Sequence, residues 1–169
     1  MCRFLAYIGE PVFLNSLVCE PAHSLLHQSL QAERAKTVTH GDGFGIGWYG
    51  EREAPAVYRE VMPAWSDENL LALCHTLRSP LFFAHVRAAT GTAIARQNSH
   101  PFRHSRWMFM HNGMVGNWSR LRRKVESLIP DDIYGARIGT TEREPAKPAA
   151  KLDPAAIFDR WNNPPPKED

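Results

Sequence analysis

The stretch LFFAHVRAAT, residues 81–90, carries the clearest strand signal of the chain and is the starting point for the fold prediction. Its apolar run, Leu81–Val86, predicts a strand that is buried on both faces. Arg87 follows directly, and its planar fork of donors suits a carboxylate, although an arginine that merely ends a strand is the commoner reading. His85 lies inside the apolar run and is therefore predicted to be a core residue rather than a base.

Shorter elements surround this strand and predict a domain of α/β or α+β class. The further strands are Phe4–Ile8, Phe44–Tyr49, Ala56–Val61 and Trp107–Met110. The helices are Pro21–Arg34, one capped by Ser66 and ended by Pro80, and one capped by Asn117 with Trp118, Leu121, Val125 and Leu128 toward the core. The stretch from Ala88 to Arg106 is long for a connection, which indicates a loop with a function.

Composition limits the class of protein. The chain has 169 residues with 43% hydrophobic and 22% charged residues, which fits one globular domain. A net charge of +2 gives no reason to expect a nucleic-acid or membrane partner. Without a recognisable signal peptide or apolar span, we expect a cytoplasmic protein. Cys2, Cys19 and Cys74 have no metal-ligand spacing, so we expect no metal site.

Glycines alternate in GDGFGIGWY, residues 41–49. This pattern lacks the Lys-Ser/Thr pair of a phosphate loop. Alternate glycines in a strand instead predict the close approach of another chain segment or of a ligand.

Cys2 follows the initiator methionine, and its small side chain favours removal of Met1. Removal would place a thiol and a free α-amine on one residue, with ordinary pKa values of about 8.5 and 7.7–8.0. A terminal amine can serve as the base for its own nucleophile. A cysteine near the terminus by chance is the alternative, and position alone favours that alternative.

Two polar motifs follow Arg87. Asn112 and Gly113 can direct an amide N–H and a backbone N–H at one point, as an oxyanion hole requires, but an Asn-Gly pair alone more often forms a hairpin turn. The cluster Asn98–Phe102 fits a loop-stabilising turn, and its His100 fits a supporting role.

The order of these motifs resembles the class II glutamine amidotransferases. The motifs are Cys2-Arg3-Phe4, GDGFGIGWY at 41–49, HVRAAT at 85–90, NSHPF at 98–102 and FMHNG at 109–113. The chain is most similar to the small stand-alone subgroup that includes the γ-glutamyl hydrolase of ergothioneine biosynthesis. The resemblance implies an α+β fold of the N-terminal-nucleophile hydrolase type, an αββα sandwich of four layers, with no metal or organic cofactor.

The resemblance also implies roles for individual residues. Cys2 corresponds to the nucleophile, and Asn112 with Gly113 to the oxyanion hole. Arg87 corresponds to the residue that grips the α-carboxylate of glutamine, and His100 is expected among the substrate-binding residues. The implied reaction hydrolyses glutamine or another γ-glutamyl amide through a thioester and releases ammonia or an amine.

The end of the chain departs from the family pattern. The family has an Asp after a Gly-Thr-Thr segment, whereas Glu142 follows Gly139-Thr140-Thr141 here and is the candidate for binding the α-amine. We expect a domain over residues 1–141 and a Pro-rich, charged tail over residues 142–169. The sandwich is then expected to be incomplete, with its apolar sheet surface covered by a second copy or another chain. A catalytically impaired remnant or a partner-dependent glutamine-binding module is the alternative function.

Overall fold

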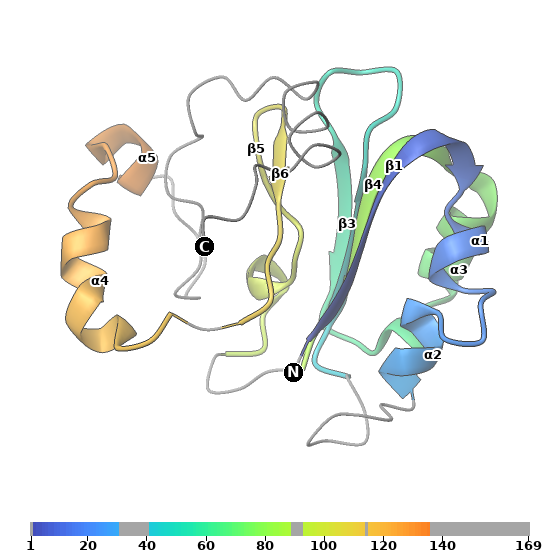
Figure 1. Cartoon of the computed structure of the whole chain (residues 1–169), viewed down its shortest axis with the longest axis horizontal. Coiled ribbons are helices and arrows are strands. Elements are labelled where there is room, and N and C mark those ends of the chain that lie inside the picture. The colour runs from blue at the N-terminus through green and yellow to red at the C-terminus, as the bar shows by residue number, and fades with distance from the viewer. Residues whose placement is uncertain (1, 31–40, 89–92, 114, 136–169) are drawn as a thin grey trace, which may run out of the picture.

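The computed structural model describes residues 2–30, 41–88, 93–113 and 115–135. Within them, a four-stranded antiparallel sheet has the order β1-β4-β2-β3 (Figure 1). The strands are β1 (Arg3–Phe13), β2 (Phe44–Trp48), β3 (Ala56–Glu60) and β4 (Arg78–Val86). The predicted tail, Glu142 and the end of the predicted helix Pro21–Arg34 lie outside the described residues.

The register of the sheet sets where the candidate residues meet. Arg3 of β1 and Phe44 of β2 both pair with Val86, the last residue of β4. The next residues outward are therefore Cys2 on one side of Arg87 and Gly43 on the other. A single edge of the sheet thus gathers the N-terminus and the end of the central strand.

Helices cover one face of this sheet (Figure 1). They are α1 (Asn15–Val18), α2 (Leu25–Leu30), α3 (Glu68–Thr76) and the 3-10 turn η1 (Ala64–Ser66). Leu14, Leu70 and Phe82 are almost completely buried between them and the sheet. Each such side chain stabilises the fold by roughly 1.5–3 kcal/mol.

The boundaries of α3 differ from the prediction. Asp67, not Ser66, caps the helix, because its carboxylate accepts a hydrogen bond of 2.9 Å from the Leu70 N–H. The Ser66 hydroxyl instead donates to the Pro63 carbonyl. Pro80 does not end the helix, which stops at Thr76, but lies inside β4. There it falls at the register shift with β1, where a residue without an N–H is tolerated.

A second antiparallel sheet stacks on the other face. It consists of β5 (Phe102–His104) and β6 (Trp107–Phe109). A Cβ at Gly45 would overlap the His100 carbonyl oxygen, and one at Gly47 would overlap the Met108 side chain. The alternate glycines therefore admit another chain segment, as predicted, and the two sheets lie closely packed.

Helices α4 (Trp118–Glu126) and α5 (Asp131–Gly135) lie beyond β5 and β6 (Figure 1). In the part of the chain that the structure describes, neither helix buries a residue, and Leu128 is 75% exposed. The predicted core-facing contact of this helix is therefore wrong for the described residues. Asn117 precedes α4 but makes no side-chain cap, because its backbone is left-handed. The described residues thus form an α+β fold with two stacked sheets and helices on the outer face of the first sheet.

Part of the apolar surface on the edge strand β1 is open. Phe4 is 48% exposed and Ile8 is 57% exposed. Their pairing with a second copy or another chain stays a prediction.

Candidate active site

Cys2, Arg87 and Asn112 meet at the edge of the sheet where β4 ends. The Cys2 thiol donates to the Ala88 carbonyl over 3.6 Å. The Asn112 side-chain Nδ2 donates to the Cys2 carbonyl over 2.7 Å, across 110 positions of the chain. The structure therefore joins three segments that are widely separated in sequence, as the motif order predicts.

Arg87 is buried and held by backbone carbonyls. Its Nη1 donates to the Asp42 carbonyl over 3.3 Å, and its Nη2 donates to the Ala93 carbonyl over 3.0 Å. Burial lowers the pKa of Arg87, while the nearby Cys2 and Asp42 oppose that shift. A guanidinium stays charged at any physiological pH, so this side chain is a fixed cation beside Cys2.

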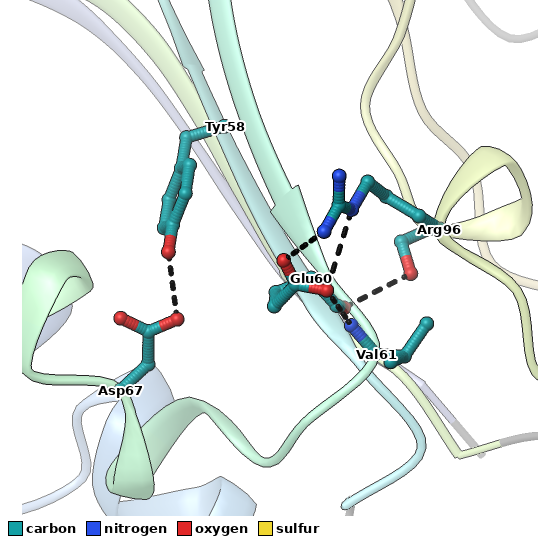
Figure 2. A network of polar contacts seen from close by, with 6 residues as sticks. Tyr58, Glu60, Val61, Asp67 and Arg96 are labelled. Carbon is teal, nitrogen blue, oxygen red and sulfur yellow. Dashed lines mark hydrogen bonds and ion pairs between the residues drawn. The ribbon is translucent and has the colours of Figure 1, made fainter.

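Contacts with Glu60, the last residue of β3, hold the loop before β5 in place. Asn98, which is 1% exposed, donates to the same Ala93 carbonyl over 3.0 Å. The Arg96 guanidinium pairs with the Glu60 carboxylate (Figure 2). The Ser99 hydroxyl donates to the Glu60 carbonyl. The polar cluster at 98–102 therefore stabilises its loop, and this supports the turn-type reading of that motif.

His100 is buried beside His85 of β4 rather than at an open surface. It is 5% exposed, and its Nδ1 lies 2.9 Å from the Nε2 of His85. His85 is itself 1% exposed, which confirms its prediction as a core residue. The His100 ring also packs edge-on against His111, with 4.8 Å between centroids. Sequence reasoning did not assign a role to His111, and its only signal was its place directly before Asn112.

Asn112 and Gly113 follow β6 and lead toward α4. They do not join two paired strands, since the β5–β6 turn is made by Ser105 and Arg106. The hairpin reading of this Asn-Gly pair is therefore wrong. Gly113 has a φ of 129°, which side-chain-bearing residues rarely adopt. Both residues are exposed, and the Asn112 amide that donates to the Cys2 carbonyl has a second N–H.

Glu142, the remaining predicted site residue, lies outside the described residues. Among the residues that the structure describes, no cluster of three or more His, Cys, Asp or Glu side chains could hold a metal ion. None of the described helices is long and apolar enough to cross a membrane.

Comparison with known proteins adds a family. Residues 13–141 match the class-II glutamine amidotransferases. The probable glutamine amidotransferase DUG3 of Saccharomyces cerevisiae is 36% identical over 154 residues, which are 85% of this chain and 43% of that protein. The gamma-glutamyl-hercynylcysteine sulfoxide hydrolase of Mycolicibacterium smegmatis is 36% identical over 141 residues, which are 82% of this chain and 62% of that protein.

A solved structure agrees with these relatives. The glutamine aminotransferase class-II domain protein of Silicibacter pomeroyi superposes with a TM-score of 0.56 at 36% identity. The aligned region covers 83% of this chain and 50% of that one. The chain thus spans between 43% and 62% of the length of these three proteins.

Proposed function

This chain belongs to the class-II glutamine amidotransferase family, and we propose that it hydrolyses a γ-glutamyl amide through a thioester on Cys2. One observation carries the proposal most directly. Cys2 is bound through its carbonyl by Asn112, and its thiol lies against Ala88, the neighbour of Arg87. These contacts support the proposal because they bring the candidate nucleophile, the candidate carboxylate-binding cation and an amide donor close together.

The proposed reaction needs Met1 to be removed, so that Cys2 carries a free α-amine. The amine takes the thiol proton, and the thiolate attacks the side-chain amide carbon of the substrate. Asn112 Nδ2 and the Gly113 N–H stabilise the negative charge on the carbonyl oxygen. The C–N bond then breaks as the leaving nitrogen receives the proton, and water cleaves the thioester to release glutamate.

Arg87 is proposed to bind the α-carboxylate of the substrate. Its guanidinium has five N–H donors in a rigid fork, and the two backbone carbonyls fix the direction of that fork. Glu142 is proposed to meet the α-amine. Its side chain is one methylene longer than that of the Asp in the resembling family pattern.

Free glutamine and γ-glutamyl conjugates present the same α-carboxylate and α-amine. The relatives carry both kinds of name, an amidotransferase and a γ-glutamyl hydrolase. We propose the γ-glutamyl group as the shared element, and comparing the turnover of glutamine with that of γ-glutamyl peptides identifies the leaving group.

The first experiment combines an intact mass with an activity assay. We expect the mass of the chain without Met1, and ammonia release from glutamine or amine release from a γ-glutamyl amide. Cys2→Ala should abolish release, whereas Cys19→Ala, at another half-buried thiol, should preserve it. Equal release by Cys2→Ala and the unchanged protein would disprove the proposal.

The alternative function is a glutamine-binding module without turnover. Thermal unfolding separates it from the enzyme, since a ligand that prefers the folded state raises the unfolding temperature. A rise with glutamine, together with no ammonia release, would favour the binding module.

A further inference from the structure

Three histidine rings pack on one another in a row that ends next to Asn112, and we call this row the histidine stack: His85, His100 and His111. They come from β4, from the loop before β5 and from the segment after β6. The His85 and His100 rings are perpendicular, with 4.3 Å between centroids, and the His100 and His111 rings are 4.8 Å apart. The stack therefore connects the two sheets.

The first contact of the stack fixes His100. Its Nδ1 lies 2.9 Å from the Nε2 of His85, and one of these nitrogens must donate while the other accepts. The two tautomers are therefore coupled. Gly45 pairs with His85 in the sheet, and its missing Cβ leaves the space that the His100 carbonyl occupies. Backbone and ring of His100 are thus both set by the first sheet.

The second contact reaches the proposed oxyanion hole. His111 packs on His100 and on Phe109, and Asn112 is the next residue of the chain. Asn112 and Gly113 are exposed, and among the described residues other than its chain neighbours, none has an atom within 4 Å of the position of a Gly113 Cβ. The Asn112 bond to Cys2 and the packing of His111 on His100 are two contacts that hold this turn.

We propose that His100 is a positioning residue, which through His111 holds the Asn112–Gly113 turn against Cys2. This inference rests on the proposed function. His100 touches no reacting atom in this proposal, and its effect is to preorganise the donors of the oxyanion hole. Donors of that kind act on the transition state, and a misplacement of about 1 Å can cost about 100-fold in rate.

Two substitutions of His100 with the same chemical group form the main test. An Asn amide reaches the place of the imidazole Nδ1, whereas a Gln amide extends one methylene further. We expect His100→Asn to keep kcat within about threefold and His100→Gln to lower it by about 100-fold, both with KM little changed. Rates are divided by the amount of Cys2 that an alkylating agent titrates, so that a loss of folded protein does not count. His104→Gln, at an exposed histidine on β5, is the matched control.

A second measurement does not depend on turnover. In ¹⁵N-labelled protein, the Asn112 side-chain amide is identified by its loss in Asn112→Asp, and its hydrogen exchange is measured. We expect exchange to be about fivefold faster in His100→Gln and unchanged in His104→Gln, because the bond to the Cys2 carbonyl is weakened. If the protein without substitutions releases no product, the proposed function is wrong. The Asn112 exchange rates still show, in that case, whether His100 positions Asn112.

Three results would overturn the inference. The first is equal kcat and equal Asn112 exchange in His100→Gln and the unchanged protein. The second is a raised KM at constant kcat, which would make His100 a substrate contact. The third is an equal loss in His100→Asn and His100→Gln. If His100→Gln does not fold, His85→Leu removes the same hydrogen bond from the other side, with His85→Gln as its conservative partner, and the same outcomes apply.

Discussion

The two faces of the four-stranded sheet are built from different chemistry. On the helix-covered face, Phe82 of β4 and Ile46 of β2 are almost completely buried among apolar neighbours. On the face toward β5 and β6, the same two strands present His85, Gly45 and Gly47. The first face is stabilised by burial of apolar side chains. The second face carries glycines instead of large apolar side chains, so the backbone of the second sheet can pack closely against it.

This difference explains where the candidate site lies. Close packing at Gly45 and Gly47 brings the loop with His100 against β4. Arg87 and Cys2 lie directly after the last residue pair of β4 and β1, at the end of the sheet. Polar contacts to backbone carbonyls, rather than side-chain volume, hold that edge together. We therefore expect substitutions on the helix-covered face to change stability most, and those on the site face to change geometry.

The largest expected loss of stability comes from Phe82→Ala. Its ring is 0% exposed, and removal of such a ring costs about 3–5 kcal/mol of unfolding free energy, because the cavity is only partly refilled. Urea unfolding measures the change. Phe83→Ala, at the next position on the opposite face, is the control and should cost clearly less, since Phe83 is only partly buried. Equal costs would contradict the assignment of the two faces.

A smaller loss is expected from Gly45→Ala. The new methyl would overlap the His100 carbonyl oxygen, a backbone atom that moves only with its loop. Overpacking of this kind costs about 1–3 kcal/mol. Gly50→Ala is the control, because its Cβ position has no described residue within 4 Å apart from its chain neighbours, and it should leave unfolding nearly unchanged. A Gly45→Ala protein as stable as Gly50→Ala would show that the two sheets are not closely packed.

Local patterns predicted the elements of the helix-covered face better than those of the site face. The strand at Leu81–Val86 and the helix around Leu70 and Cys74 were predicted, because the spacing of apolar residues within a short stretch of sequence indicates a buried strand or helix. β5 was missed, because Phe102–His104 has one apolar residue and two exposed polar ones. β1 was predicted too short, since its apolar run ends at Ile8, whereas the strand continues to Phe13 past an irregular pairing.

The candidate site depends on contacts between distant segments, which spacing alone does not encode. Cys2, Arg87 and Asn112 were selected through the order of their motifs, and each alone had a commoner structural interpretation. The stacking of His111 on His100 was not predicted, because it depends on how the second sheet sits on the first. Glu142 stays a prediction.

The cap of α3 offers a prediction of intermediate size. Asp67→Ala removes the acceptor for the Leu70 N–H and for the Tyr58 hydroxyl, which is bound over 2.8 Å (Figure 2). Loss of an N-cap costs about 1 kcal/mol, which urea unfolding resolves. Ser66→Ala removes only a hydroxyl bonded to the Pro63 carbonyl and should cost less. A larger loss of unfolding free energy in Ser66→Ala than in Asp67→Ala would indicate that Ser66 caps the helix, as the sequence predicted.

The smallest expected change in stability comes from Arg96→Ala on the site face. The ion pair with Glu60 joins an arginine side chain that is 65% exposed to a carboxylate that is 19% exposed, so solvent screens it and its contribution is about 0.2–1 kcal/mol. Urea unfolding at low and high salt should show a cost that shrinks as salt rises, because exposed charges are screened. Arg106→Ala, which breaks the more exposed pair with Glu53, is the control and should cost less at low salt. A cost for Arg96→Ala above that of Gly45→Ala would mean that charge, rather than close backbone packing, holds the loop of His100 on the sheet.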